Sequence, residues 1–239
     1  MRKYIFVFCT FIFSVSCFSQ KQDDSLIISS LTENVWNYEA WASFDGHYFP
    51  SNGLVIKTDS GLVLVDTPVN DSLTQQLLNY FPNEKIALSR ITHFHNDRIG
   101  GIKTLLNNGI KVISHSKTAE LAEKDSYPKP SVTFKGNDTI IKTGNTSFEL
   151  YYPDWGHTID NIVIWLPLQN VLYGGCFIKS KESKTLDNIK DANVKKWLIA
   201  AKKVEKKFSE ARIVVPGHGD IGNKTLIKKT IRLIKKSKT

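Results

Sequence analysis

The chain of 239 residues has only three cysteines, and two of them, Cys9 and Cys17, lie near its N-terminus. If that segment is removed on export, Cys176 alone remains, which excludes an intramolecular disulfide. The sequence also lacks an apolar run of the roughly 20 residues that span a bilayer as a helix. Repeats, low-complexity stretches and linkers are absent as well. We therefore expect one domain of ordinary size over residues 20–239.

The N-terminus has the layout of a secretory signal. Two basic residues precede an apolar run over residues 4–13, and small residues follow as far as Ser19. This order is typical of a signal peptide. We expect residues 1–19 to be removed after Ser19, which would place the protein in the periplasm without stable membrane association. The alternative is a lipoprotein signal with lipid on Cys17, although a serine lies three positions earlier, where a branched apolar residue is usual.

The formal charge is +9, and a basic protein can bind nucleic acid. The lysines, however, are concentrated in residues 194–208 and 226–236, where apolar residues recur between them at helical spacing. Such lysines belong to the solvated faces of amphipathic helices. The interleaved aromatic residues and glycines of single-strand binders are missing. We expect no nucleic-acid partner.

The most informative stretch is residues 92–98, Thr-His-Phe-His-Asn-Asp-Arg, which two glycines follow. His93, His95 and Asp97 occupy alternate positions, whereas ligands on one helix face would lie three or four apart. Alternate positions suit a turn at the end of a strand. Because imidazole and carboxylate are both zinc donors, this stretch predicts a metal site. The structural alternative is two loop histidines with a helix-capping aspartate.

Three more candidate ligands each follow a short apolar run into a glycine-containing turn. They are His157, Cys176 and His218. Strand ends of this kind are the usual place for functional side chains on a rigid scaffold. A lone cysteine is otherwise more often a small buried hydrophobe. His47 and His115 lack this strand-to-glycine context, and we expect both to be structural.

These six donors divide between two metals. Three imidazoles make a zinc site with an open position, and an aspartate, a cysteine and a histidine make a softer site that thiolate biases toward zinc. Two neighbouring cations lower the pKa of a bound water and polarise the bond that it attacks. The predicted chemistry is hydrolysis.

The secondary-structure pattern is that of an α/β chain. Strands are expected at residues 35–43, 51–58, 60–66 and 86–91, helices at 70–81, 99–107, 194–208 and 226–234, and hairpins around Gly136-Asn137 and Gly144-Asn145. Strands that do not alternate strictly with helices imply mixed sheets.

Several ordered segments carry a family resemblance. They are LVLVDTP from Leu62, HFHNDRIGG from His93, GHT from Gly156 with Asp160-Asn161, VLYGGCFIKS from Val171, Asp191-Ala192-Asn193, and VVPGHG from Val214. With them the chain resembles the subclass B1 metallo-β-lactamases over nearly all of its mature length. The resemblance implies an αβ/βα sandwich of two mixed sheets flanked by helices, with the metals at one edge. It also implies zinc-dependent hydrolysis of the β-lactam amide bond of penicillins, cephalosporins and carbapenems, and hence antibiotic resistance.

The resemblance further implies roles for individual residues. The first of two zinc ions would be held by His93, His95 and His157, and the second by Asp97, Cys176 and His218. Asp97, Lys179 and Asn188 would serve catalysis, with Lys179 binding the substrate carboxylate and Asn188 near the β-lactam carbonyl. Residues 44–50 would form a flexible flap whose aromatic side chains, Phe44 and Tyr48, contact the substrate.

The chain departs from the family pattern at Asp187, which precedes Asn188 where relatives often have glycine. Arg98 and Cys176 fit subclass B1 and argue against glyoxalase-like, lactonase-like and RNA-processing relatives. Asp66, at the end of an apolar strand, is expected to orient the metal loop as a partner of the ligands.

Two other functions remain open from the sequence. One is a non-catalytic periplasmic protein that buffers or delivers zinc, which would require a closed site with four ligands. The other keeps the fold but hydrolyses a different ester or lactone. We expect a monomer whose partner is a small β-lactam.

Overall fold

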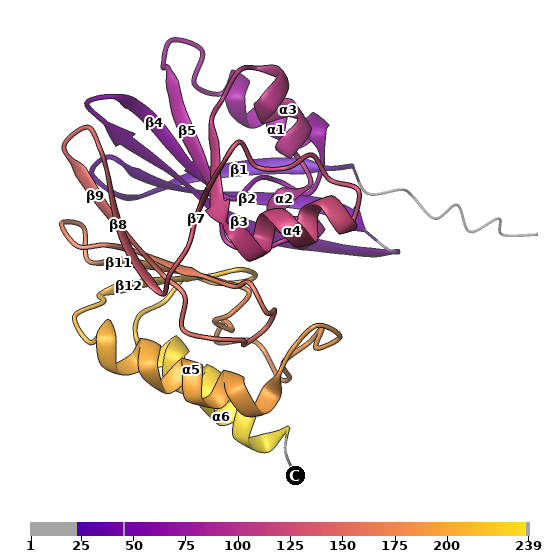
Figure 1. Ribbon diagram of the computed structural model, residues 1–239, viewed down its shortest axis with the longest axis vertical. Coiled ribbons are helices and arrows are strands. Elements are labelled where there is room, and N and C mark those ends of the chain that lie inside the picture. Colours follow the sequence, from indigo (N-terminus) through magenta and orange to yellow (C-terminus); the bar gives the residue numbers. More distant parts are fainter. Residues whose placement is uncertain (1–22, 45, 238–239) are drawn as a thin grey trace, which may run out of the picture.

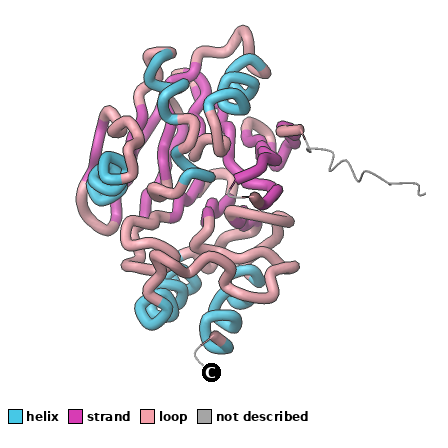
Figure 2. Tube along the Cα trace, turned by 90° about the vertical axis from the view of Figure 1, so that its right-hand side faces the viewer, coloured by secondary structure: helices cyan, strands magenta, loops and turns pink. Residues whose placement is uncertain are grey.

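The computed structural model describes residues 23–44 and 46–237. The expected signal peptide, its cleavage after Ser19 and the alternative lipidation of Cys17 lie outside the described residues. Two β-sheets pack against each other, and helices cover both outer faces (Figure 1). A view from the side shows helices on both sides of the strands (Figure 2). The expected αβ/βα sandwich is confirmed. Among the described residues, no helix has the length and apolarity needed to cross a bilayer.

The first sheet has seven strands, which lie side by side in chain order. They are β1 (Ser25–Thr32), β2 (Val35–Phe44), β3 (His47–Thr58), β4 (Gly61–Val65), β5 (Ile86–Ile91), β6 (Val112–His115) and β7 (Val132–Phe134). Neighbours from β1 to β4 are antiparallel, and those from β4 to β7 are parallel. The sheet is mixed, as expected.

The second sheet has five strands in the order β12-β11-β10-β9-β8. They are β8 (Asp138–Thr143), β9 (Thr146–Tyr151), β10 (Val163–Leu166), β11 (Val171–Gly175) and β12 (Ile213–Pro216). All neighbours are antiparallel except β11 and β12, which are parallel. This sheet is therefore mixed as well.

The helices divide between the two sheets. The first sheet is accompanied by α1 (Asp71–Asn79), α2 (Asn96–Ile99), α3 (Ile102–Asn107) and α4 (Ser116–Lys124), and the second by α5 (Val194–Lys207) and α6 (Thr225–Lys236). Asn70 and Asn193 cap α1 and α5 by accepting a backbone N–H from the first turn. Such caps typically contribute about 1 kcal/mol each. The lysine-rich segments are amphipathic helices, as expected.

The strand β4 shows how the layers are held together. Val63 and Val65 belong to the core between the two sheets, whereas Leu62 and Leu64 pack with α1 and α3 on the outer face. A strand that is buried on both faces reads as a continuous apolar run. Complete burial of each such side chain contributes about 1.5–3 kcal/mol.

Two connections differ from the sequence expectation. Gly136-Asn137 does not close a hairpin, because β7 pairs with β6 in the first sheet while β8 pairs with β9 in the second. A glycine–asparagine pair marks a turn but does not select the strands that pair. Residues 47–50 belong to β3, whose pairing with β2 continues to Phe44 opposite His47. Only the expected hairpin at Gly144-Asn145 is confirmed.

Candidate metal centre

The six candidate ligands come from four connections that meet at one edge of the sandwich. His93 and His95 follow β5, and Asp97 lies in the first turn of α2. The remaining ligands follow β9, β11 and β12. Because parallel strands place their carboxyl ends at the same edge of a sheet, β11 and β12 present their loops together. The loop after β5, from the other sheet, meets them there. Segments up to 125 residues apart in sequence, from His93 to His218, thereby converge.

The first group consists of the three histidines. The ring centroids of His93, His95 and His157 lie 4.9 to 5.2 Å apart. Nδ1 of His95 is 3.1 Å from Nε2 of His157. Nε2 of His93 is buried and has no partner among the described residues. A buried nitrogen without a hydrogen bond is costly, and a metal ion would satisfy it.

The second group consists of Asp97, Cys176 and His218. Oδ2 of Asp97 is 3.2 Å from the Cys176 sulfur and 3.1 Å from Nε2 of His218. The sulfur and Nε2 of His218 are 3.3 Å apart. Together with His93, the donors of the two groups lie within 4.8 Å of one another in overlapping sets of three. The two sites are therefore neighbours.

These spacings fit zinc. With zinc–nitrogen bonds of about 2.0–2.1 Å and zinc–sulfur bonds of about 2.3 Å in a tetrahedron, ligand atoms lie about 3.3–3.6 Å apart. The observed separations of 3.1 to 3.3 Å are slightly shorter. Imidazole, carboxylate and thiol together also favour zinc over magnesium or calcium.

For two of the histidines, a neighbouring group fixes which ring nitrogen is free to bind metal. Nε2 of His95 contacts Oδ2 of Asp191 at 3.0 Å, and Nδ1 of His218 contacts the Pro50 carbonyl oxygen at 2.7 Å. Each contact holds the N–H on the ring nitrogen that makes it. Nδ1 of His95 and Nε2 of His218 therefore remain free to bind metal. Carboxylates and carbonyls orient metal-binding histidines in this way.

Burial sets the protonation of two histidines of the first group. It lowers the pKa of His93 and of His157 well below the usual range, and the neighbouring histidine adds to the effect. Both rings are consequently neutral, which is the form that binds metal.

In the second group the charges oppose burial. Burial alone would raise the pKa of Asp97, but the Arg98 guanidinium and His218 outweigh it and hold that pKa well below its usual value. Burial alone would lower the pKa of His218, yet Cys176 and Asp97 raise it to about 9. A cation at this place would replace the His218 proton.

Arg98 ties the second group to the fold. Its side chain is fully buried and donates to Oδ2 of Asp97 at 2.7 Å, to the Gly217 carbonyl at 2.7 Å and to Tyr173 at 2.8 Å. It also donates to the Asn52 carbonyl on β3. One planar guanidinium thus connects α2, β3, β11 and the loop after β12, which suits its fork of rigid donors.

Asp66 orients the loop of the first motif, as expected. Its carboxylate accepts the Thr92 backbone N–H at 2.7 Å, the Thr92 hydroxyl and the Tyr173 hydroxyl at 2.7 Å. Burial raises the pKa of Asp66 to about 6, and Arg98 and these hydrogen bonds work against the rise. The residue beside His93 is thereby fixed.

A glycine is required next to the second group. A Cβ atom on Gly217 would lie 2.7 Å from the Cys176 sulfur and 2.6 Å from its backbone nitrogen. Real Cβ contacts are not that short, so any side chain would push the loops after β11 and β12 apart. The Val-Pro-Gly-His pattern therefore combines a ligand, His218, with the close approach that it needs.

The residues expected to contact the substrate differ in their burial. Lys179 is buried, and its Nζ lies 6.0 Å from the centroid of the Trp197 ring, which itself packs 5.7 Å from His157. Asn188 is exposed and accepts the Lys190 backbone N–H. The side chain of Phe44 lies outside the described part of the chain.

Tyr48 is turned away from the metal ligands. Its ring stacks on Trp41, and its hydroxyl donates to the Asp23 carbonyl. Side chains alternate along a strand, so Phe49 faces the opposite side, where its ring meets His218 edge-on at 5.5 Å. The sequence pattern identified an aromatic hairpin without fixing which ring points inward.

The two histidines expected to be structural have different surroundings. His115 accepts the Lys117 N–H at the start of α4 and stacks on Tyr152, which accounts for it without a ligand. His47 is exposed at the hairpin end of β3. Neither belongs to a group of possible metal donors among the described residues.

Sequence reasoning assigned no role to Asp191 or Asn52. Asp191 contacts His95, and the Asn52 amide donates to the carbonyls of Pro216 and Gly219 on either side of His218. Asp191 lies in one of the matched segments, which was a usable signal. Nothing in the sequence around Asn52 links it to a loop 164 residues away.

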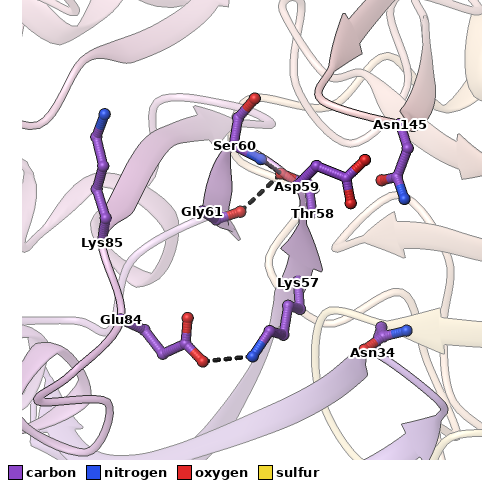
Figure 3. A pocket seen from close by; sticks show the side chains of 9 residues that line it. All are labelled: Asn34, Lys57, Thr58, Asp59, Ser60, Gly61, Glu84, Lys85 and Asn145. Carbon is purple, nitrogen blue, oxygen red and sulfur yellow. Dashed lines mark hydrogen bonds and ion pairs between the residues drawn. The ribbon is translucent and has the colours of Figure 1, made fainter.

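A separate hollow of about 730 Å³ lies near the other end of the strands (Figure 3). It is lined by residues 58–61, Lys57, Glu84, Lys85 and Asn145, with Asn34 beside them. Residues 84 and 85 precede β5, whereas the candidate ligands His93 and His95 follow it. Lys57 and Glu84 pair with each other. No histidine or cysteine lines it, so it belongs to a different part of the molecule from the metal centre.

Replacing the sulfur donor of the second group should separate the two sites. In Cys176→Ser a hydroxyl that stays protonated takes the place of a soft thiolate, so the second group should lose its metal first. We expect one zinc per chain instead of two by elemental analysis after dialysis, with the histidine group still filled. Two tightly held zinc ions in this variant would contradict the assignment of Cys176.

The comparisons with known proteins agree with this geometry. The metallo-β-lactamase superfamily profile matches residues 48–218. The chain is 42% identical to a metallo-β-lactamase type 2 of Bacillus cereus, over 90% of this chain and 85% of the relative, and 35% identical to one of Bacteroides fragilis, over 97% and 96%. The solved metallo-β-lactamase of Pontibacter korlensis superposes with a TM-score of 0.85 at 34% identity, over 88% of this chain and 99% of that one. Identity at this level over nine-tenths of the chain, on a matching fold, makes this protein a member of subclass B1 of the metallo-β-lactamase superfamily.

Proposed function

We propose that the protein is a β-lactamase that uses two zinc ions to hydrolyse the amide bond of penicillins, cephalosporins and carbapenems, and so confers antibiotic resistance. The observation that supports it best is the pair of adjacent donor groups at one edge of the sandwich. Zinc in such a site supplies an activated water and polarises the carbonyl that it attacks. A serine or cysteine nucleophile is not required, and Cys176 is committed as a metal donor.

The residues of the chain bind and orient the substrate. Lys179 lies beside Trp197, and the Trp197 ring packs against His157, so the ammonium can hold an anion on the side of the first group. β-Lactams carry a carboxylate next to the ring nitrogen, and a partly desolvated ion pair with that carboxylate would fix the ring orientation. Lys179 is thus the proposed substrate-carboxylate residue.

The other contacts are proposed from position. Asn188 lies in the exposed loop after Lys179, from which its amide can approach the β-lactam carbonyl as a hydrogen-bond donor. The flap, residues 44–50, forms the hairpin end of β2 and β3. Within it we propose Phe49, whose ring contacts His218, as the apolar substrate contact in place of Tyr48, whose ring faces the other side.

The role of Lys179 is tested by reversing its charge. For a penicillin with a free carboxylate, Lys179→Glu should lower kcat/KM by about two orders of magnitude, mainly through KM if the contact is made equally in the ground and transition states. The methyl ester of the same penicillin should be a poor substrate for the parent enzyme and nearly indifferent to the substitution. Zinc content should be unchanged.

The matched control is Lys228→Glu, which makes the same charge change on the exposed face of α6. It should leave both substrates unaffected. If the free acid and the ester lost activity equally in Lys179→Glu, Lys179 would be supporting the metal loop and not binding the substrate.

We further propose that the enzyme works in the periplasm as a monomer. The basic and apolar pattern of residues 1–19 supports export. Mass spectrometry of the protein from a periplasmic fraction distinguishes a chain beginning at Gln20 from one whose N-terminus is a lipidated Cys17, and light scattering gives the oligomeric state.

A further inference from the structure

Asp187 has an unusual place in the loop between β11 and α5. Its backbone has φ of 54°, in the left-handed region that favours glycine and that aspartate and asparagine also adopt. Thr185 holds it there, since the Thr185 hydroxyl donates to Oδ1 of Asp187 at 2.9 Å and accepts its backbone N–H at 3.1 Å. These two hydrogen bonds with Thr185 orient the Asp187 carboxylate.

The other carboxylate oxygen of Asp187 points to Lys179. Oδ2 of Asp187 lies 3.2 Å from Nζ of Lys179. The Lys179 side chain is only 6% exposed, and among the described residues Asp187 is its one acidic partner. A buried ammonium needs a hydrogen-bonded anion, and Asp187 supplies it.

The two members of this pair differ in solvent exposure. The side chain of Asp187 is 59% exposed, so its carboxylate can turn into water once its hydrogen bond with Thr185 breaks, whereas the Lys179 ammonium is buried. The carboxylate of an incoming substrate would approach the Lys179 ammonium, whose charge the Asp187 carboxylate already neutralises. Two anions beside one buried ammonium would repel each other, so the substrate has to displace Asp187.

We propose that Asp187 is a built-in competitor for the substrate carboxylate and thereby sets the specificity of the enzyme. This inference rests on the proposed role of Lys179. By occupying the ammonium, Asp187 weakens binding of every substrate that carries a carboxylate at this place. A substrate without that carboxylate is not penalised. Asp187 thus narrows the difference in affinity between acidic and neutral substrates.

The test is Asp187→Asn, which removes the charge but keeps the size and the tolerance for a left-handed backbone. KM for the penicillin with a free carboxylate should fall about two- to fivefold with little change in kcat, the scale of a partly exposed ion pair. KM for its methyl ester should not change. Glu182→Gln, an exposed acid on the same loop that is not paired with Lys179, is the matched control and should alter neither value.

A second arm places both substitutions in one chain. In Lys179→Met the benefit of Asp187→Asn should disappear, because nothing is left to compete for. An unchanged KM for the free acid in Asp187→Asn, with Lys179→Glu still raising it, would overturn the inference and leave the proposed function intact. Equal gains for acid and ester would also overturn it, since loop opening would then explain both. If Lys179→Glu affects the two substrates alike, the role of Lys179 itself fails.

Discussion

Removal of zinc should abolish hydrolysis of a chromogenic cephalosporin, with kcat/KM falling by about three orders of magnitude or more. All six donors identified at the edge of the sandwich are side chains that bind metal, and no described residue there replaces the chemistry that zinc supplies. The thermal midpoint should fall as well, because an ion that binds only the folded state stabilises it. The measurement is activity and thermal denaturation after dialysis against a chelator.

Zinc added back should restore activity at two equivalents per chain, whereas magnesium or calcium should not, because thiol and imidazole donors disfavour both. Inhibitors that trap a serine nucleophile should have little effect on the parent enzyme. Activity that survives complete removal of metal would refute the mechanism outright, and recovery at one equivalent would refute the two-metal assignment.

Replacement of Arg98 by methionine should destabilise the protein by about 3–5 kcal/mol, because one partner of a buried ion pair is removed and Asp97 and Asp66 are left without it. The carbonyls of Asn52 and Gly217 lose a donor at the same time. For a chain of this size, the thermal midpoint should drop by roughly 6–20 °C. The second zinc should dissociate more easily because Asp97 and the loop of His218 are no longer held together.

Arg90→Met provides the matched control. Arg90 is also fully buried, but within the described chain its guanidinium has no acidic partner, donates to Thr143 and lies 3.9 Å above the Phe148 ring. Burial lowers its pKa to about 9. Removing an unpaired buried charge should cost little or even stabilise. Both variants are compared by urea unfolding and by zinc titration. Equal losses of unfolding free energy and of zinc affinity would show that Arg98 contributes only through the volume that it fills in the core. Arg98→Lys keeps the charge and gives an intermediate variant if the methionine form does not fold.

The sequence by itself identified the candidate ligands and most of the strands that precede them. The strand at residues 86–91 is found at those positions, and His93, His95 and Asp97 follow it. A short apolar run that ends in a glycine turn is a local pattern, and it was enough to place Cys176 and His218 directly after strands and His157 in the loop after β9. The lysine-rich helices could also be predicted, because the spacing of their apolar residues is set within each helix.

Only the tertiary structure decided which distant groups meet. Tyr48 and Phe49 are adjacent aromatic residues, and their opposite roles depend on which face of β3 turns toward His218. The turn at Gly136 joins two sheets and not two neighbouring strands, because pairing depends on partners elsewhere in the chain.

The same holds for the network around the metals. Asp191 reaches His95, Asn52 reaches the loop of His218, and Arg98 joins four segments. These contacts depend on the order of strands in the two sheets, which no local spacing encodes. The pairing of Asp187 with Lys179 is closer in sequence, yet its direction follows from a left-handed backbone that only the folded loop reveals. Local sequence patterns therefore predicted the metal chemistry of this protein. Long-range packing decided how the charged residues are arranged around the metal centre.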